Sequence, residues 1–305
     1  MSVATTYADR AAWLAARRLG IGGSDVPAIL GLSPYSTPLQ VWASKVGIAE
    51  ELDESYVLRR GSHMEPLLWR ELESELPGIR TFPQSLTIVV GAEPWMRYSP
   101  DAWVSTSTPG DFREALGEGK SHPRGASEWD DGVPPHVVAQ VQWGMHVCDL
   151  PSAYVAVDLG TEFKWARVDR DPEWWPTHEA TLRAFWHAVE TETPPAPTGD
   201  EGDTSALARM FPREKPGTIV SLPGAMLSIA EAWDAAAAAE RTAAEERQRI
   251  GNLIRAEMKE AERVVLPDGS GWTWRVQERV KMVADPDGAK SSSRVLLRAK
   301  ARKER

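Results

Sequence analysis

Four short motifs in the first half of the chain combine the residue types that metal-assisted phosphate chemistry requires. In chain order they are Gly61-Ser-His-Met-Glu65, Ser99-Pro-Asp101, Glu118-Gly-Lys120 and Ala139-Gln-Val-Gln142, all within about eighty residues. Carboxylates supply the oxygen ligands that hard cations such as Mg²⁺ prefer. A lysine beside them can position or deprotonate an attacking water. The motifs therefore predict a divalent-metal site next to a scissile phosphate.

The Glu-x-Lys pattern occurs three times, and its surroundings favour the first copy. Asp101 lies seventeen residues before Glu118, and the strand and turn predicted between them let neighbouring antiparallel strands bring both carboxylates together. Alternation along a strand places Glu118 and Lys120 on one face. Glu162-Phe-Lys164 begins another predicted strand without a suitably placed preceding aspartate, and Glu257-Met-Lys259 falls in a solvated-looking helix. We interpret these two copies as surface charges.

Other motif positions allow either a structural or a functional interpretation. Glu65 lies on a predicted helix, where a glutamate is ordinarily exposed, and His63 beside it is expected at the surface. Gln140 and Gln142 lie on an otherwise apolar helix, and amides that face a core need partners. The segment from Arg17 to Asp25, Arg-Arg-Leu-Gly-Ile-Gly-Gly-Ser-Asp, is either a turn with a helix cap or an anion site. Glycine N–H groups, a serine hydroxyl and an arginine can together hold a phosphate.

The elements that must position these residues follow an α+β order. Helical spacing and caps such as Thr37 predict helices over 7–18, 26–30, 38–46, 58–76, 136–147 and 173–190. Alternation predicts strands over 85–90, 95–98, 102–105 and 115–121, and a hairpin of 153–157 with 163–168. The acidic motifs thus fall next to strands, and the glutamines fall on the helix that follows them.

The composition changes in the last third of the chain. Proline, glycine and acidic residues favour a linker, which we place at 196–224. It would separate a first domain at 1–195, which carries the motifs, from an appendage at 225–305.

Within the appendage, three segments differ in character. Ala, Glu and Arg predict a long helix over 225–261, interrupted at Gly251, and a β-hairpin follows over 264–283. Seven Lys and Arg residues and one Glu then occupy 290–305. This basic tail is either a solubilising end or a non-specific contact with nucleic acid.

The bulk composition bounds the class of protein. The chain has 305 residues, of which 42% are apolar and 26% charged, so a folded core is expected. Its single cysteine, Cys148, excludes an internal disulfide and predicts a reducing compartment. No secretory signal begins the chain and no apolar run approaches the roughly 20 residues that span a bilayer, so a cytoplasmic location is expected. The net charge of −9 argues against a general polyanion binder, although metal ions and a local basic lining can offset it.

The motif order between Arg17 and Val168 resembles that of the YqaJ-like viral recombinase family, to which lambda exonuclease belongs, within the PD-(D/E)xK nuclease superfamily. The resemblance implies a restriction-endonuclease-like core, with a central mixed sheet flanked by helices, followed here by the C-terminal helical segment and β-hairpin. It implies a Mg²⁺-dependent deoxyribonuclease, with Mn²⁺ able to substitute, that degrades double-stranded DNA ends from 5′ to 3′ in phage-type recombination. Gly119 departs from the family pattern, in which a bulkier middle residue is common.

The same resemblance implies a role for each motif residue. The implied metal ligands are Asp101, Glu118 and Glu65. The residues implied to act beside them are Lys120, which activates or orients water, and Gln140, with Gln142 as the alternative. The residues implied to bind the 5′ phosphate of the DNA end are Ser24, Ser99 and either Arg17 or Arg18.

The resemblance also implies partners, namely double-stranded DNA ends, a single-strand annealing protein and further copies of the chain in a ring such as a trimer. Three alternatives stay open: another PD-(D/E)xK nuclease that acts on single-stranded or structured DNA, a non-catalytic DNA-end-binding recombination scaffold, and a helical interaction scaffold built on 225–261. Retention of Asp101, Glu118 and Lys120 argues against the second. One cysteine excludes an iron–sulfur nuclease, because such clusters need several thiolates.

Overall fold

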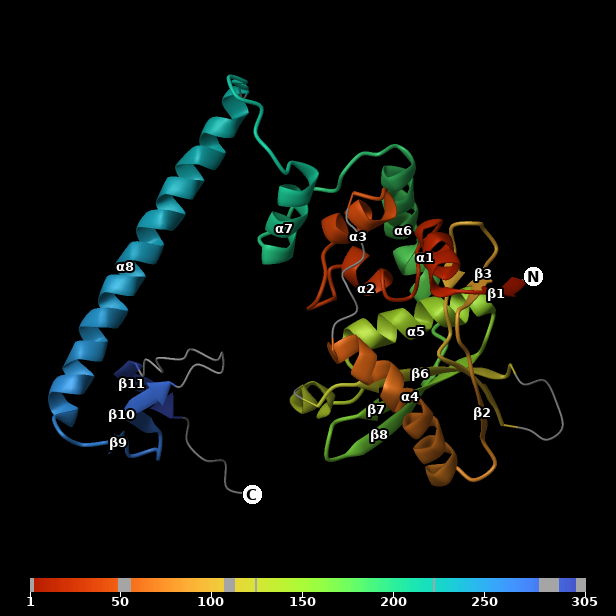
Figure 1. Cartoon of the computed structure of the whole chain (residues 1–305), viewed down its shortest axis with the longest axis horizontal. Helices are drawn as coiled ribbons and strands as arrows, with labels where there is room; N and C mark the ends of the chain where they lie inside the picture. Colours follow the sequence, from red (N-terminus) through yellow and green to blue (C-terminus); the bar gives the residue numbers. More distant parts are fainter. Residues whose placement is uncertain are drawn as a thin grey trace, which may run out of the picture. The chain divides into compact units, whose positions relative to one another are not determined.

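The structure is a computed structural model that describes residues 3–48, 56–106, 113–123, 125–221, 223–279 and 291–299 (Figure 1). The chain divides into two compact units, Met1–Lys215 and Pro216–Arg305. Each unit has its own sheet or sheets. The motif residues all lie in the first unit.

A five-stranded sheet forms the centre of the first unit. Its spatial order is β2 (Arg80–Pro83), β5 (Ala102–Ser105), β6 (Ala115–Ser121), β7 (Ser152–Asp158) and β8 (Phe163–Asp169). The β6–β7 pair is parallel and the other pairs are antiparallel, so the sheet is mixed. The sequence had predicted an α+β fold with a central mixed sheet flanked by helices, and this prediction is confirmed.

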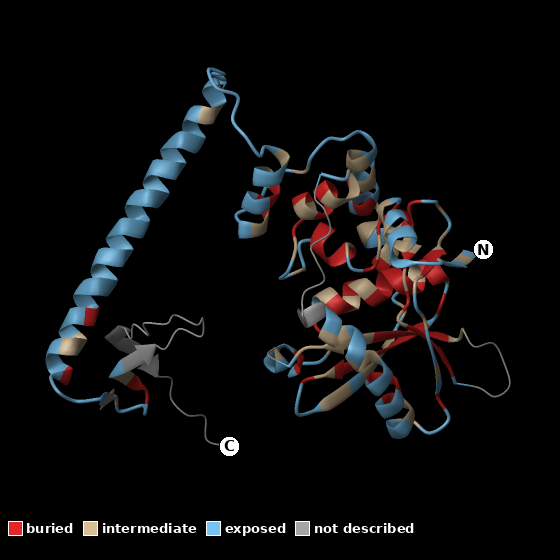
Figure 2. Cartoon of the chain, in the orientation of Figure 1, coloured by how far each residue is buried: buried red, intermediate tan, exposed pale blue. Residues whose placement is uncertain are grey.

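Helices cover the two faces of this sheet, because strand residues alternate between them. On one face, Leu68 and Trp69 of α4 (Tyr56–Glu75) pack with Tyr154 of β7. On the other face, Trp143 of α5 (Pro135–Cys148) lies in the core that contains Val155 of the same strand. Figure 2 shows buried residues along the central strands and exposed residues on the outer side of α4. The strand β6 is therefore held between α4 and α5.

A second sheet and several smaller helices complete the first unit. The sheet has the order β1 (Val3–Thr6), β3 (Thr87–Val90) and β4 (Arg97–Tyr98), and all of its pairs are antiparallel. The remaining helical elements are α1 (Arg10–Arg18), α2 (Val26–Ile29), α3 (Pro38–Lys45), the 3-10 helix η1 (Ala126–Trp129), α6 (Trp174–Glu190) and α7 (Glu201–Met210). Thr37 and Gln40 form the capping box of α3, which confirms the predicted cap.

The helix α7 lies inside the segment 196–224, which the sequence predicted as a linker. The side chain of Asp203 on α7 is buried and accepts a hydrogen bond from the Thr37 hydroxyl at the start of α3. The described chain divides only after Lys215. Residues 201–210 are therefore a helix of the first unit, because tertiary contacts order a segment whose composition suggested a linker.

The second unit consists of a long helix and a small sheet. After the 3-10 helix η2 (Gly224–Met226), α8 runs without interruption from Leu227 to Met258, so the predicted break at Gly251 is wrong. The strands β9 (Arg263–Val265) and β10 (Gly271–Arg279) form the predicted hairpin, and β11 (Ser291–Ala299) pairs with the other side of β10. Of the predicted basic tail, residues 290 and 300–305 lie outside the described residues. No helix in the described part of the chain is both long and apolar enough to cross a membrane.

Candidate active site

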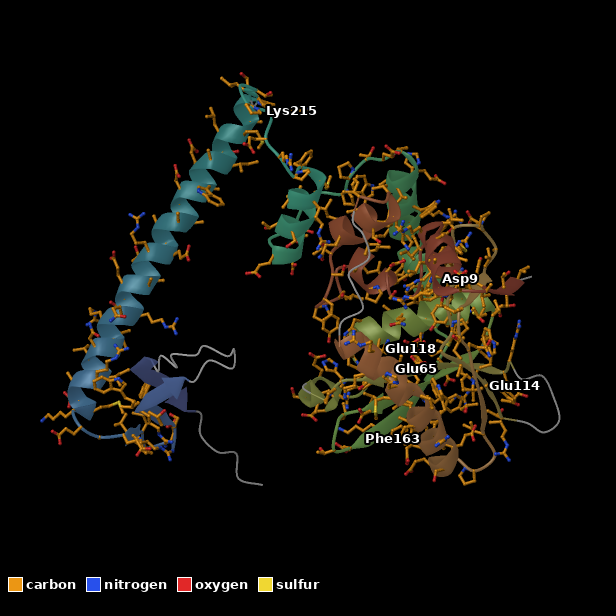
Figure 3. All side chains as sticks on the ribbon, in the orientation of Figure 1. Asp9, Glu65, Glu114, Glu118, Phe163 and Lys215 are labelled. Atoms are coloured by element: carbon orange, nitrogen blue, oxygen red, sulfur yellow. The ribbon has the colours of Figure 1, made fainter. Side chains whose placement is uncertain are left out.

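One pocket of the first unit gathers almost every residue that the motifs predicted. It has a volume of about 360 Å³ and lies where β5, β6, α4 and α5 meet the loop after α1. The predicted residues that line it are Arg17, Ser24, Glu65, Ser99, Asp101, Glu118, Lys120 and Gln140. Glu65 on α4 and Glu118 on β6 lie close together in Figure 3. Segments far apart in sequence thus contribute to one concave site.

Glu118 is the centre of the hydrogen-bond network in this pocket. Its Oε1 accepts from Lys120 Nζ at 2.5 Å and from Gln140 Nε2 at 2.6 Å. Lys120 Nζ also donates to Gln140 Oε1 at 3.0 Å, which closes a triangle of side chains. The Glu118 residue is only 1% exposed, and a buried carboxylate needs such partners. The choice of Gln140 over Gln142 agrees with this geometry.

Gln142, the alternative, has a structural environment instead. Its Nε2 donates to the carbonyl of Asp169 at 2.9 Å, and its Oε1 accepts from the N–H of Asp171 at 3.0 Å. These bonds tie α5 to the end of β8. The buried amide is therefore satisfied away from the pocket.

Two more carboxylates share the pocket with Glu118. Asp101 directly precedes β5, and its Oδ2 accepts from the N–H of Gly119 at 2.9 Å. Burial, and next the charge of Glu118, hold the pKa of Asp101 well above its usual range. Burial and Glu118 also raise the pKa of Glu65. Glu118 thus disfavours the charged forms of Asp101 and Glu65, an effect that a bound cation would offset.

Lys120 is the cationic group at the centre of these acids. Burial by itself would lower its pKa, but Glu118 and Asp101 outweigh that effect and raise the pKa above the ordinary value. Its side chain is 28% exposed, whereas that of Glu118 is 2% exposed. The ammonium group thus bridges the buried carboxylate and the open part of the pocket.

The two faces of β6 explain why glycine stands within the motif. Glu118 and Lys120 point toward α5, whereas Gly117 and Gly119 face α4. A Cβ on Gly119 would lie 3.1 Å from Leu68 Cδ1, and a Cβ on Gly117 would lie 3.1 Å from the Trp69 ring. The small residues let α4 approach closely, which places Glu65, one turn before Trp69, at the pocket.

Tyr98 is a site residue that the sequence interpretation missed. Its hydroxyl donates to Glu118 Oε2 at 2.7 Å, and the ring is almost fully buried. The ring fits between Gly23 and Gly144, since a Cβ on either glycine would lie 2.5 Å from it. Its position three residues before Asp101 was a signal, but a hydrogen bond across two sheets could not be read from spacing.

A basic side of the same pocket is formed by the segment after α1. Arg17 Nη2 donates to Ser24 Oγ at 2.9 Å, and the guanidinium lies 4.7 Å from the centroid of the Trp13 ring. Arg97, which the motifs did not identify, also lines the pocket. Ser99 completes the polar lining, so these side chains can surround an anion beside the acidic group.

The structure separates the two arginines that the sequence left as alternatives. Arg18 does not line the pocket, and its Nε is buried without a hydrogen-bond partner. Consecutive residues of a helix point about 100° apart, so only one of them can face the pocket. Asp25 is structural: its Oδ2 accepts from the N–H of Gly22 at 2.7 Å and lies 2.6 Å from Lys45 Nζ. His63 is exposed and also lies outside the pocket lining.

The donor set of the pocket suits a hard cation, although the side chains are not arranged as a ready-made cage. Among the described residues, no group of three or more His, Cys, Asp or Glu side chains is placed to hold a metal ion. Mg²⁺ typically uses only one or two carboxylates and takes its other ligands from water and substrate phosphate. Asp101 and Glu118, with Glu65 nearby, meet that requirement.

A pocket with three carboxylates and one lysine, on a mixed sheet between two helices, is the kind of site that the four motifs predicted. Residues 12–151 match the family model described as the YqaJ-like viral recombinase domain. This match covers somewhat less than half of the chain, and it confirms the resemblance seen in the motifs.

One curated relative is the uncharacterized protein YqaJ of Bacillus subtilis (strain 168), which is 28% identical over 179 residues. The matched region covers 54% of this chain and 51% of that protein. The chain therefore spans about half the length of this relative.

Three solved structures are similar to parts of this chain. LHK-Exo, an alkaline exonuclease from Laribacter hongkongensis, is 17% identical, with a TM-score of 0.47 over 66% of this chain and 100% of that chain. LHK-Exo in complex with dAMP is 18% identical, with a TM-score of 0.48 over 60% of this chain and 94% of that chain. A phage-related exonuclease from Haemophilus somnus is 11% identical, with a TM-score of 0.44 over 57% and 95% of the two chains.

Proposed function

We propose that the chain is a metal-dependent deoxyribonuclease that removes nucleotides from double-stranded DNA ends, from 5′ to 3′, in phage-type recombination in the host cytoplasm. The observation that carries the proposal is the convergence of Asp101, Glu118 and Lys120 with Gln140 in one pocket. These residues come from the turn before β5, from β6 and from α5, and all were identified from motifs that resemble those of a recombinase family. A pocket built for packing alone has no need of three carboxylates.

In this proposal Mg²⁺, or Mn²⁺ in its place, is held by Asp101 and Glu118 with help from Glu65. When bound, the metal would supply Lewis-acid stabilisation of the charge that develops on the phosphate. Lys120 orients or activates the attacking water at its ammonium group. Gln140 holds both Glu118 and Lys120 in position through its amide, and Tyr98 fixes the other oxygen of Glu118.

The basic side of the pocket would bind the terminal 5′ phosphate. Arg17 and Ser24 are already hydrogen-bonded to each other, so both can turn their remaining donors toward one anion. A phosphate gripped there would position the next phosphodiester near the carboxylates, which supports action at ends and the 5′-to-3′ direction. Charge-assisted contacts of this kind are short and specific.

The proposal is tested by digestion of three DNA molecules with Mg²⁺ present: covalently closed circular duplex, linear duplex with 5′-phosphate ends, and the same linear duplex with 5′-hydroxyl ends. We expect the closed circle to persist and the phosphorylated linear duplex to be degraded fastest, with a 5′ label released before a 3′ label. Equal attack on the circle would contradict exonuclease action, and early release of the 3′ label would contradict the direction.

A further inference from the structure

Three ring side chains form a cluster beside the catalytic pocket. The Tyr35 hydroxyl lies 3.4 Å from His122 Nε2, and the Tyr35 and His122 ring centroids are 6.3 Å apart. The Tyr35 and His136 rings meet edge to face, with their centroids 5.7 Å apart. Tyr35 is nevertheless 63% exposed. The cluster therefore presents an aromatic surface to solvent instead of packing in the core.

The backbone connects this cluster to two residues of the pocket. His122 follows Lys120 by two positions, and its N–H donates to the Asp158 carbonyl at 2.8 Å, which continues the β6–β7 pairing. Residues two apart on a strand share a face. His136 lies four residues before Gln140 on α5 and so shares a face of that helix. Because Lys120 and Gln140 are hydrogen-bonded to each other, the two imidazoles extend the same rows of side chains beyond the pocket.

The position of Tyr35 is fixed by its loop. Ser33 Oγ accepts hydrogen bonds from the N–H groups of Tyr35 and Ser36, at 3.1 and 3.2 Å. The loop is short and joins α2 to the capped N-terminus of α3. The backbone that carries the ring is therefore ordered before a ligand binds, which lowers the conformational cost of stacking.

The charges around the cluster favour a base of a DNA strand over a phosphate as its ligand. Glu128 Oε2 lies 3.9 Å from His122 Nδ1, and an acid beside the imidazole disfavours a second phosphate. Glu128 and Lys120 both act on the pKa of Tyr35, which burial raises, so a cation and an anion both lie near the ring. A neutral aromatic ligand suits such surroundings better than an anion.

We infer that Tyr35, supported by His122 and His136, is a stacking site for a nucleobase of the DNA strand whose phosphate occupies the pocket. This inference rests on the proposed function. Every base has an aromatic face, so stacking holds a strand without selecting its sequence. Such tolerance is what an enzyme needs if it is to move through DNA of any sequence.

The test compares 5′-phosphorylated linear duplexes that carry one abasic residue at successive positions near the end with the intact duplex. The proteins are the wild type, Tyr35→Ala, Tyr35→Phe and Phe211→Ala, the last being a control in which another exposed ring, 70% exposed, is removed. For the wild type, we expect an abasic residue at one position to lower kcat/KM about tenfold, as expected for loss of one stacked base. Tyr35→Ala should be slower by a similar factor on intact DNA and insensitive to the abasic residue. Tyr35→Phe and Phe211→Ala should behave as the wild type does.

Two results would overturn the inference. In one, Tyr35→Ala equals the wild type on intact DNA. In the other, it is slower by the same factor on intact and abasic DNA, which shows that the ring does not act through the base. If the wild type degrades no DNA, the proposed function fails. The fluorescence anisotropy of the same duplexes with the same proteins then decides the stacking site, which requires that Tyr35→Ala weaken binding of intact DNA only.

Discussion

Two copies of Glu-x-Lys lie on the same sheet, and their surroundings differ. Lys120 on β6 and Lys164 on β8 are both in register with Val157 of the strand between them, so they share a face of the sheet. Lys120 Nζ lies 2.5 Å from Glu118, whose side chain is 2% exposed, whereas Lys164 Nζ lies 3.7 Å from Glu162, whose side chain is 60% exposed. The same three-residue pattern therefore gives a buried network in one place and a surface ion pair in the other.

The difference comes from what lies next to each strand. β6 is an inner strand, so β5 brings Asp101 to one side of it and α5 brings Gln140 over its face. β8 is an edge strand, and among the residues that the structure describes Lys164 pairs only with Glu162 and with the exposed Asp130, 4.0 Å away. A surface ion pair of that kind contributes little. Neighbouring elements, and not the motif alone, therefore create the buried network around Lys120.

The largest effect should follow from removing the metal or one of its proposed ligands. Chelation with EDTA should abolish degradation of linear duplex, and Mg²⁺ or Mn²⁺ should restore it. Asp101→Asn should lower the rate on the order of a thousandfold, because metal catalysis supplies several kcal/mol. Asp130→Asn is the matched control, because Asp130 lies beside Lys164 of the other Glu-x-Lys copy, and it should leave the rate unchanged. Full activity in EDTA would contradict the proposal that degradation depends on a divalent metal.

The next largest effect is expected from the lysines. Lys120→Gln should lower kcat about a hundredfold or more, the usual size for loss of a group that stabilises charge in the transition state, and should leave DNA affinity nearly unchanged. Lys164→Gln should cut at the wild-type rate. Single-turnover cleavage and anisotropy measure the two quantities. If Lys164→Gln were the slow variant, Glu162-Phe-Lys164 would be the catalytic copy of Glu-x-Lys.

A smaller effect is expected on the basic side of the pocket. Arg17→Ala and Ser24→Ala should reduce the preference for 5′-phosphate over 5′-hydroxyl ends about tenfold, since a charge-assisted hydrogen bond contributes roughly 1.5–3 kcal/mol. Arg18→Ala is the control, because Arg18 does not line the pocket. The ratio of initial rates on the two ends is the measurement. A change of preference in Arg18→Ala alone would reverse the assignment of the two arginines.

The smallest effect concerns Gly119, the middle residue of Glu118-Gly-Lys120. Gly119→Ala should destabilise the protein by about 1–3 kcal/mol, the usual cost of overpacking, because its Cβ would lie 3.1 Å from Leu68 Cδ1. Gly199→Ala, where a Cβ meets nothing within 4 Å, should not destabilise. Denaturant unfolding midpoints measure both. Equal stability of the two variants would show that β6 does not need glycine to pack against α4.

The sequence predicted the elements around the pocket closely, for a physical reason. Strands 102–105 and 115–121 were predicted with the bounds they have, because alternating side chains must face α4 and α5 in turn. What failed depended on tertiary contacts. The strands β1 and β2 were missed because neither has a buried residue, so no apolar pattern marks them. The helix α7 was taken as linker because Asp203 meets its partner far along the chain.

The candidate site shows the same limit. Motif spacing identified the carboxylates and Lys120, because these residue types are the ones that metal-assisted phosphate chemistry requires. It did not identify Tyr98, whose hydrogen bond to Glu118 depends on the packing of Gly23 and Gly144 around its ring. It could not choose between Arg17 and Arg18, because that choice depends on the rotation of α1. The pairing of β11 with β10 was likewise missed, since charge composition obscured the strand.

The most direct measurement compares Glu118 and Glu162, the glutamates of the two Glu-x-Lys copies at this sheet. Glu118→Gln and Glu162→Gln each remove one negative charge, the first from β6 and the second from the residue directly before β8. Circular dichroism shows whether each variant folds. Each is assayed for release of labelled nucleotides from 5′-phosphorylated linear duplex, and for Mn²⁺ binding by electron paramagnetic resonance. We predict that Glu118→Gln loses both nucleotide release and Mn²⁺ binding, whereas Glu162→Gln retains both. A folded Glu118→Gln variant that binds Mn²⁺ and degrades DNA at the wild-type rate would contradict the assignment of this pocket as the nuclease site.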